Sequence, residues 1–399
     1  MNGKKSLVVG MWCTALAASI AAAGCKKEEP PAPAPAMEAK PPEPPKPAEP
    51  PPPKPFTAEE QVKWYQDCWA KFNAKDFDGF KKCFAPDATT EMVDSGQPPF
   101  KGADATMGAQ MFAKGFPDAK GEAQLILQNG KTTVGVWLIT GTNSGAMPGP
   151  GGDMPPTNKK VGMLVGHIIV AGDNNMAASE KMYQDLGELA SQLGMSKMPG
   201  RPAMDKGAAS PTIVIAKDDD TEKKNLETDK AATEAWNKHD VKAVDGYYAA
   251  DAVMYESAEA KDQSKKEMIA GLGDLYKAMS DVKLDGVTAW AAGDYVITTG
   301  TFTGTNDGPM MKMKPTGKKV AAQYLQIERF EGGKIKQSWL FYNSMAMAMQ
   351  LGLIPPPAAG GDMKGAPPAG APPAEGGDKA APAAPPAGKE APPAPKGAQ

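Results

Sequence analysis

The sequence predicts two tandem α+β domains, each a cone of three helices packed on a curved antiparallel β-sheet, between disordered Pro-rich ends. Two observations lead to this architecture. First, 14 of the 40 prolines lie in residues 26–55 and 13 lie in residues 355–399. Second, the residues between these ends carry one pattern twice, with helix-like periodicity first and strand-like runs afterwards.

The repeat consists of four short motifs that occur in the same order in both halves. In the first copy the motifs are Phe72–Asp76, Thr140–Gly145, Pro156–Val161 and Gln192–Gly194. In the second copy they are Trp236–Asp240, Thr303–Gly308, Pro315–Val320 and Gln350–Gly352. We therefore assign residues 56–195 to domain 1 and residues 221–354 to domain 2, with residues 196–220 as a linker.

In domain 1, Thr57 and Glu60 form a possible capping box that opens a helix ending near Ala74. A second helix is expected over residues 77–84 and a third around residues 104–114. β-Branched and apolar runs then predict strands at 124–128, 132–142 and 161–170, and in domain 2 at 296–303, 320–330 and 334–342. A short strand-like run at 212–215 has no predicted partner.

The N-terminus has the features of a secretory signal. Lys4 and Lys5 precede an uncharged apolar stretch, Leu7–Ala23, and then Cys25. The end of this segment resembles the lipobox of bacterial lipoproteins, which implies a signal peptide over 1–24 and a lipid on Cys25. By the same resemblance Lys26 favours the periplasmic face of the outer membrane of a Gram-negative cell. The alternative is an ordinary cleaved signal with an incidental cysteine.

Residues 25–55 and 355–399 are too rich in proline and small residues to bury a core. We expect the first to be an extended, polyproline-like tether and the second a disordered tail. Two cysteines remain in domain 1. Cys68 and Cys83 are 15 residues apart and are a disulfide candidate in an oxidising compartment, the alternative being two buried thiols.

Composition narrows the function classes. With 44 basic and 47 acidic residues of mixed order, a nucleic-acid partner is not expected. Only two histidines are present, so we expect no metal site, and no nucleotide or redox motif suggests a cofactor. Membrane contact is expected through the lipid anchor only.

The order of helices and sheet resembles the nuclear transport factor 2-like superfamily, and the motifs resemble its SnoaL-like (polyketide cyclase and ester cyclase) branch. The residues that carry this resemblance are the Gly-Thr-x-x-Gly strand ends, the Pro-Thr-x-Lys-Lys-Val strand starts, Glu331–Ile335 and the closing Gln-Leu-Gly. The resemblance implies an apolar pocket inside each cone and an acidic residue on the last strand. It also implies pairing through the sheets, so the two copies could form an intramolecular pseudo-dimer.

Counting back seven residues from each Gln-Leu-Gly places Asp185 at the family's acid position and Asn343 at the same position in domain 2. His167 lies six residues after Val161, as Gln326 lies six after Val320, so Asp185 and His167 are the candidate catalytic pair. The alternative for Asp185 is the N-cap of a C-terminal helix over 186–193. The residues expected to line the pockets are Trp69, Phe72, Trp137, Trp236, Tyr324, Gln326, Tyr342 and Asn343.

Three functions are consistent with the sequence. The leading prediction is the binding of a small apolar or amphipathic molecule without turnover. The second is a cyclase, isomerase or hydrolase that uses Asp185 with His167. The third is a non-catalytic interaction module at the cell envelope, which predicts filled cones without a cavity.

Overall fold

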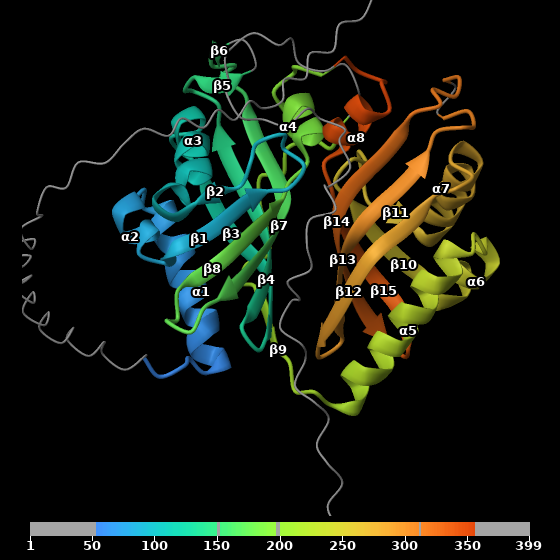
Figure 1. Cartoon of the computed structure of the whole chain (residues 1–399), viewed down its shortest axis with the longest axis horizontal. Coiled ribbons are helices and arrows are strands. Elements are labelled where there is room, and N and C mark those ends of the chain that lie inside the picture. The colour runs from blue at the N-terminus through green and yellow to red at the C-terminus, as the bar shows by residue number, and fades with distance from the viewer. Residues whose placement is uncertain (1–52, 150–151, 197–199, 311–312, 356–399) are drawn as a thin grey trace, which may run out of the picture. The chain divides into compact units, whose positions relative to one another are not determined.

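The computed structural model of this chain describes residues 53–149, 152–196, 200–310 and 313–355 (Figure 1). The predicted signal peptide, the lipidation site at Cys25, most of the tether and nearly all of the tail lie outside the described residues. In the described part of the chain, no helix is long and apolar enough to cross a membrane.

Domain 1 contains a seven-stranded sheet with the order β2-β1-β8-β7-β4-β3-β9. Its elements in chain order are α1 (Ala58–Asn73), α2 (Phe77–Lys81), β1 (Phe84–Met92), β2 (Phe100–Lys101), a 3-10 turn (Gly102–Asp104), α3 (Met107–Gly115), β3 (Lys120–Asn129), β4 (Thr132–Thr142), β5 (Met147–Gly149), β6 (Gly152–Met154), β7 (Lys160–Ala171), β8 (Ala177–Tyr183) and α4 (Leu186–Gln192). The strand-like run in the linker is β9 (Thr212–Ile215), which pairs in parallel with β3 at the edge of this sheet.

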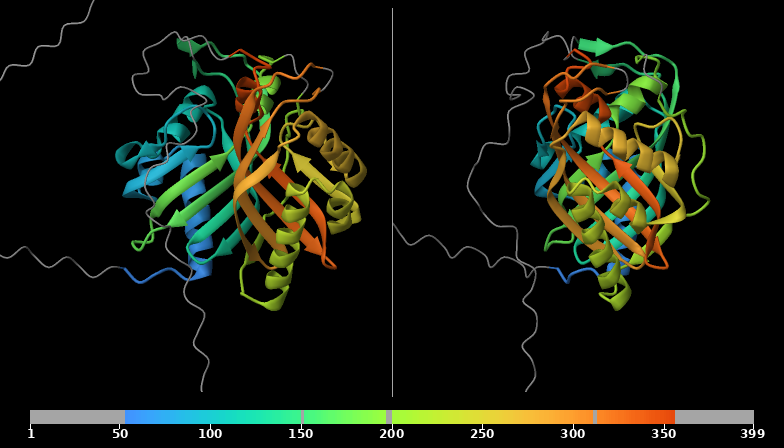
Figure 2. Two further views of the ribbon diagram at one scale, coloured as in Figure 1. Left: turned by 45° about the vertical axis from the view of Figure 1, so that its right-hand side comes forward. Right: turned by 90° about the vertical axis from the view of Figure 1, so that its right-hand side faces the viewer.

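Domain 2 repeats the same order in a six-stranded sheet, β11-β10-β15-β14-β13-β12. Figure 2 shows α5, α6 and α7 on one side of this sheet. The elements are α5 (Asp220–Asn237), α6 (Val241–Tyr247), β10 (Tyr248–Glu256), β11 (Gln263–Ser264), α7 (Lys265–Ala278), β12 (Lys283–Ala292), β13 (Tyr295–Thr305), β14 (Lys319–Glu331), β15 (Lys334–Phe341) and α8 (Ser344–Gln350).

The structure confirms two α+β copies but corrects the order of their elements. A strand, β1 or β10, comes between the second and third helices, so the predicted helix over 77–84 ends at Lys81. This strand runs parallel to the last strand of its domain, β8 or β15. Each sheet is therefore mixed rather than wholly antiparallel. Apolar Phe84 and Ala85, which continue the pattern of α2, are buried as strand residues instead.

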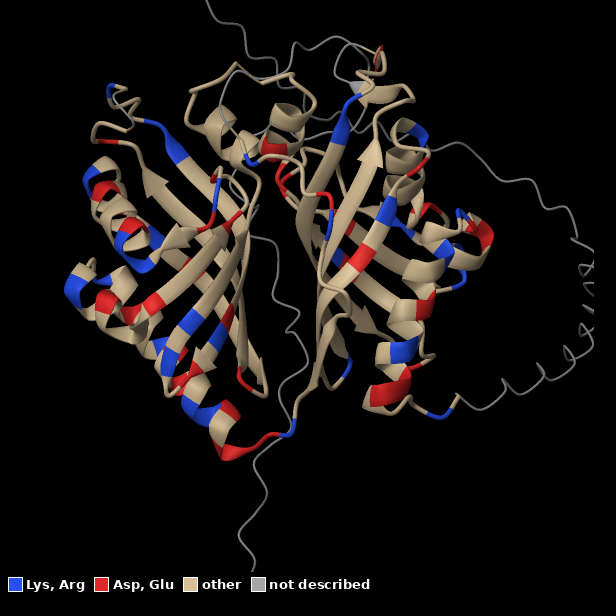
Figure 3. Cartoon of the chain, turned by 180° about the vertical axis from the view of Figure 1, so that it is seen from behind, with Lys and Arg blue, Asp and Glu red and all other residues tan. Residues whose placement is uncertain are grey.

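Helix α1 begins where the sequence predicts. Thr57 Oγ1 accepts a hydrogen bond from Glu60 N at 3.2 Å, and Glu60 Oε2 accepts one from Thr57 N at 2.8 Å, which completes the capping box. Tyr65, Trp69 and Phe72 form its buried face, while charged residues lie along α1 and α5 (Figure 3). This division between one apolar and one charged face holds the helix against the sheet.

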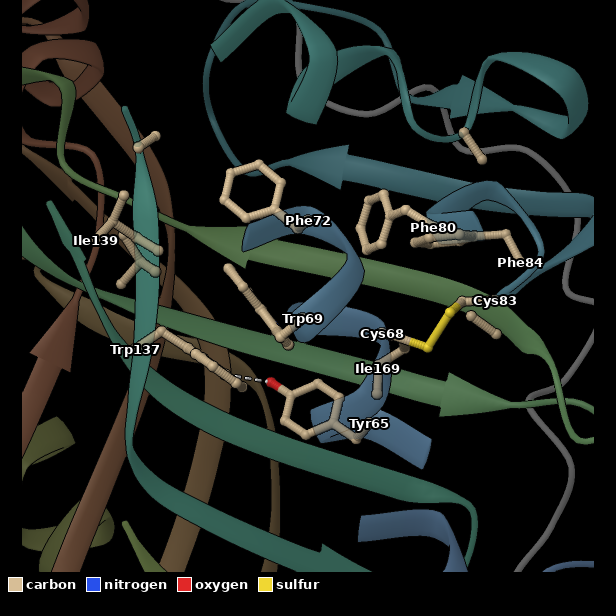
Figure 4. Packing of buried hydrophobic residues seen from close by; sticks show 14 of the residues in the cluster. Tyr65, Cys68, Trp69, Phe72, Phe80, Cys83, Phe84, Trp137, Ile139 and Ile169 are labelled. Atoms are coloured by element: carbon tan, nitrogen blue, oxygen red, sulfur yellow. Dashed lines mark hydrogen bonds between the residues drawn. A yellow bond between two sulfur atoms is a disulfide. The ribbon is translucent and has the colours of Figure 1, made fainter. Parts of the chain in front are cut away.

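A disulfide joins Cys68 of α1 to Cys83, which lies just before β1 (Figure 4). Both sulfur-bearing residues are 2% exposed and belong to the main core of domain 1. The predicted pairing is therefore present in the structure. It fixes the end of α1 against the start of the sheet.

The other faces of the two sheets share one hydrophobic cluster. It includes Leu127, Val136 and Leu138 from domain 1 and Leu325, Ile327 and Phe341 from domain 2, among others. Gly166 of β7 permits a close approach of the sheets, because a Cβ atom there would lie 2.5 Å from Leu325 Cδ2 and 3.0 Å from Phe341 Cδ2. In a strand, alternate residues point to opposite faces. His167 and Glu180 therefore lie on the helix-covered face of the domain 1 sheet.

Candidate functional site

A cavity of about 70 Å³ lies between the helices and the sheet of domain 1. Its walls are mainly apolar, and about half of the lining residues are aromatic or methionine. They include Trp69, Phe72, Phe80, Phe100 and Phe112, together with Met92, Met163 and Met182. Figure 4 shows Trp69 and Phe72 on α1, facing the sheet. Among the described lining residues only Glu91 and Glu180 are ionisable.

Glu180 is the end of a buried chain of hydrogen bonds. Trp137 Nε1 donates to the Tyr65 hydroxyl at 2.7 Å, and the Tyr65 hydroxyl lies 2.6 Å from His167 Nδ1. On the other side of the ring, His167 Nε2 bonds Glu180 Oε1. The chain therefore runs from the core behind the cavity to a carboxyl group on its wall.

The donors in this chain fix the tautomer of His167. An indole N–H can only donate, so the Tyr65 oxygen accepts from Trp137. The single Tyr65 hydrogen is then available for His167 Nδ1, and the ring proton sits on Nε2 and is donated to Glu180. This assignment gives every donor an acceptor, which matters because Tyr65 is 0% exposed and His167 is 2% exposed.

Gly135 of β4 makes room for this arrangement. A Cβ atom there would lie 2.4 Å from both the Tyr65 hydroxyl and Trp137 Nε1. Burial raises the pKa of Tyr65 well above its ordinary value, with hydrogen bonds from Trp137 and Trp69 acting in the opposite sense. Tyr65 is therefore a neutral hydrogen-bond donor at physiological pH.

The predicted residues of domain 1 fall into three places. Trp69 and Phe72 line the cavity. Trp137 is stacked behind Trp69, with ring centroids 4.1 Å apart, and His167 lies behind Glu180. Trp137 and His167 therefore support the wall and are not among the residues that line it.

Asp185 does not meet His167, and the predicted catalytic pair is corrected here. Asp185 directly follows Gln184 after the last strand and caps α4, as its alternative interpretation predicted: Oδ1 accepts from Gly187 N at 2.8 Å. The same oxygen accepts from Ser344 N and Oγ of domain 2 at 3.0 and 2.7 Å. Burial raises its pKa, and these hydrogen bonds oppose the rise. The acid next to His167 is Glu180.

The predicted residues of domain 2 are also divided. Trp236, Tyr324 and Gln326 lie on the helix-covered side, where Trp236 contacts the rings of Tyr276 and Phe302. Asn343 caps α8, the counterpart of Asp185, and donates to Asp94 O at 2.9 Å. Tyr342 donates to Glu256 Oε1 at 2.7 Å. Tyr342 and Asn343 thus lie just after β15, at the end of the sheet, and their hydrogen bonds connect it to Glu256 and Asp94.

On its helix-covered face, domain 2 holds a cluster of buried polar side chains that the sequence interpretation missed. Asp229 of α5 accepts from Thr298 at 3.3 and 3.4 Å, and Glu328 of β14 accepts from Gln326 at 2.6 Å and from Tyr248 at 3.1 Å. Burial raises the pKa of Asp229 to about 6 and that of Glu328 well above its ordinary value. The mutual repulsion of these carboxyl groups adds to the rise for Glu328.

Signals for the missed acids exist in the sequence. Glu180 and Met182 lie on one face of β8, and Gln184 continues this alternation just after the strand, but the weak strand formers of residues 172–179 hid this strand. Asp229 and Glu328 occupy the repeat positions of Tyr65 and Ile169, so aligning the copies residue by residue would have revealed these replacements of apolar or aromatic residues by acids.

In the described residues, no group of three or more His, Cys, Asp or Glu side chains could hold a metal ion.

The chain thus has two α+β domains with helices over one face of a mixed sheet, and one of them encloses an acid-bearing cavity, which defines a cone-shaped class of fold. The chain matches the family described as SnoaL-like polyketide cyclase over residues 59–193 and again over 227–351. It therefore belongs to this family, with two tandem copies of the domain.

Solved structures resemble single domains of the chain. A putative hydroxylase, AclR from Streptomyces galilaeus, is 26% identical, with 34% of this chain and 85% of that chain covered and a TM-score of 0.32. A putative polyketide cyclase, IdmH from Streptomyces antibioticus, is 22% identical over 32% and 98%, with a TM-score of 0.29. A putative SnoaL-like cyclase from Jannaschia sp. CCS1 is 17% identical over 35% and 99%, with a TM-score of 0.32. No curated protein matches the chain.

Proposed function

We propose that domain 1 binds a small apolar or amphipathic molecule in its cavity, with Glu180 as its polar contact. The observation that carries this proposal is a carboxyl group, held by His167, on the wall of a mainly apolar cavity that is rich in aromatic and Met side chains. Apolar walls supply binding energy through burial, and one fixed polar group orients the ligand. The Met side chains can adapt to its shape.

The cavity is smaller than the roughly 300–1,000 Å³ of pockets for drug-sized ligands. A larger molecule would have to displace α3, which contributes Gly108, Ala109 and Phe112 to the wall. The cavity also distinguishes domain 1 from the filled cone that a purely structural module predicts. We therefore rank ligand binding above that alternative.

The test is native mass spectrometry of protein purified from its own cells, to detect a small molecule that copurifies. Ala109→Phe should fill the cavity and remove the bound mass. Met107→Phe is the matched control, because Met107 lies on the same helix but is 38% exposed. Loss of the bound mass in the control as well, or no bound mass in the wild-type protein, would count against the proposal.

A second candidate function is proton transfer to a bound substrate, as in an isomerisation or ring closure. Glu180 would be the general base or acid, and His167 would position it through the Nε2 hydrogen bond. This replaces the predicted role of Asp185. Turnover that is lost in Glu180→Gln while ligand affinity is retained would favour an enzyme, and unchanged turnover would exclude this role for Glu180.

Two further proposals concern placement and assembly. From the sequence of residues 1–25 we propose a lipid on Cys25 and a place at the cell envelope. Labelling with palmitate should be lost in Cys25→Ala; undiminished label would refute it.

We also propose that the two domains act as an intramolecular pseudo-dimer, supported by their shared hydrophobic cluster and by the bonds of Asp185 and Asn343 across it. Both domains should then unfold in one transition in a protein that is monomeric by light scattering. Independent melting of the halves would contradict this.

A further inference from the structure

We propose that the cavity of domain 1 selects a small organic cation, an alkylated ammonium group that lies beside Glu180 against the aromatic walls. This inference rests on the proposed ligand binding and names the chemical class of the ligand. It is carried by the charge of the cavity, the nature of its walls, its size, and the contrast with domain 2.

The cavity has one carboxylate whose charge is not matched. Glu91, at the wall, has Lys181 Nζ at 3.4 Å and the Gln323 amide at 3.2 Å. Glu180 has only His167, and no described Lys or Arg pairs with it. Both ring nitrogens of His167 are already used, Nδ1 by the Tyr65 hydroxyl and Nε2 by Glu180 Oε1, so His167 holds only one of the two Glu180 oxygens.

The walls favour a cation over an anion. The described lining contains no Lys or Arg, whereas it contains five aromatic rings and three Met sulfurs. A cation close to an aromatic face is attracted by the negative face of the ring, and more strongly when the cation is desolvated. An unpaired charge in an apolar site is costly, so a ligand of opposite charge removes a cost that a neutral ligand leaves in place.

The volume limits the group that can enter. About 70 Å³ is less than half of the roughly 150 Å³ of an engineered apolar cavity that holds benzene. The side chain of Glu180 is 11% exposed, so a ligand can reach it without unfolding the chain of hydrogen bonds. The cavity therefore suits a compact head group, and a longer molecule would extend from it towards the mouth.

Domain 2 has no acidic residue at the position of Glu180. In the sheet register, Glu180 lies opposite Ile169, and Ser338 lies opposite Glu328 at the corresponding place. A neutral hydroxyl thus replaces the carboxylate, and Tyr324 stands at the position of Val165, which lines the cavity in domain 1. The carboxyl groups of Asp229 and Glu328 in domain 2 are buried and accept hydrogen bonds from Thr298, Gln326 and Tyr248, so we expect no cation site there.

The test compares two isosteric probes that suit this volume, protonated methylamine and neutral methanol, on the full chain at pH 7. Methionine methyl groups labelled with carbon-13 report binding by NMR, since Met92, Met163 and Met182 line the cavity. We expect the cation to shift these signals with an affinity at least about tenfold higher than that of the alcohol, a difference of 1.4 kcal/mol. Methionine signals of domain 2 should not move.

Glu180→Gln should abolish the preference for the cation while the alcohol still binds. Glu91→Gln is the matched control, and it should keep the preference. Equal or weaker binding of the cation in the wild-type protein overturns the cation site and leaves ligand binding standing. If neither probe moves the methionine signals of domain 1, both the cation site and the proposed function fail. A preference lost only in Glu91→Gln overturns the assignment to Glu180.

Discussion

His167 Nε2 donates to Glu180 Oε1 between two adjacent strands, and this bond turns a core histidine into the support of a cavity carboxylate. The histidine is itself held by the Tyr65 hydroxyl at Nδ1. Both ring nitrogens are therefore committed, which fixes the orientation of the ring and the position of the Glu180 oxygen. The contribution of these hydrogen bonds to stability can be measured directly.

Tyr65→Phe should break the chain at its centre. Trp137 Nε1 loses its acceptor and His167 Nδ1 loses its donor, both in the core. We expect a loss of about 1–3 kcal/mol in the free energy of unfolding, the usual cost of buried polar groups left unpaired. Urea titration followed by tryptophan fluorescence measures it. Tyr295→Phe, at a half-buried tyrosine of β13, should change stability by less than about 0.5 kcal/mol. Equal effects of the two substitutions would refute the special role of Tyr65.

Glu188 makes stability depend on pH. Burial, with Asp185 adding repulsion, raises its pKa from 4.5 to about 9 in the folded chain. The folded state then binds a proton that the unfolded state releases, so its stabilising contribution is present below about pH 4.5 and is lost as pH rises towards 9. Glu188→Gln should be more stable than the wild type by at least about 1.4 kcal/mol near pH 8, equivalent to one pKa unit.

Denaturant titrations from pH 5 to pH 9 check this, and the gap between wild type and Glu188→Gln should widen steadily with pH. Glu227→Gln, on the exposed side of α5, should leave the pH profile unchanged. A constant gap across the range would mean that the Glu188 carboxyl group titrates alike in the folded and unfolded chain.

Asp229 should act in the same sense over a lower range. Burial raises its pKa to about 6, so its contribution is lost as pH rises from about 4 to about 6. Asp229→Asn should flatten the decline of stability in this window. Carbon-13 NMR of the Asp carboxyl groups can follow the titration directly. A carboxyl signal of Asp229 that titrates near pH 4 would contradict the expectation.

Gly166→Ala should weaken the packing between the two sheets. The new Cβ atom would meet the side chains of Leu325 and Phe341, and overpacking of this kind costs typically 1–3 kcal/mol. The control is Gly246→Ala in α6, where a Cβ atom meets nothing within 4 Å. Unfolding should show a destabilised protein for Gly166→Ala only, together with faster proteolysis in the linker. Wild-type stability in Gly166→Ala would argue that the contact is loose.

Replacing Cys68 and Cys83 together by Ala should lower the free energy of unfolding by about 3 kcal/mol, as expected for a loop of 15 residues. Reduction with dithiothreitol should destabilise the wild type but leave the double variant unchanged. An effect of the reductant on the double variant would show that it acts elsewhere in the chain.

Much of the fold could be predicted from the sequence because it depends on local chemistry. The capping box of Thr57 and Glu60 begins α1, and the apolar face with Tyr65 and Trp69 predicts its packing. Cys68 and Cys83 lie at a spacing that suits a bond between neighbouring elements. The first strand of each copy escaped prediction, since β1 pairs in parallel with β8, almost a whole domain away in sequence.

The sequence by itself determined that this protein has two copies of one α+β domain, because periodicity, caps and turns are written in consecutive residues. Only the tertiary structure decided which acid faces the cavity. Asp185 and Glu180 are five residues apart, and the choice depends on where β8 ends and α4 begins, and on its register with β7. A strand sends alternate side chains to opposite faces and a helix cap turns its side chain back to the backbone. Glu180 therefore lies on the wall of the cavity, whereas Asp185 accepts a hydrogen bond from Ser344.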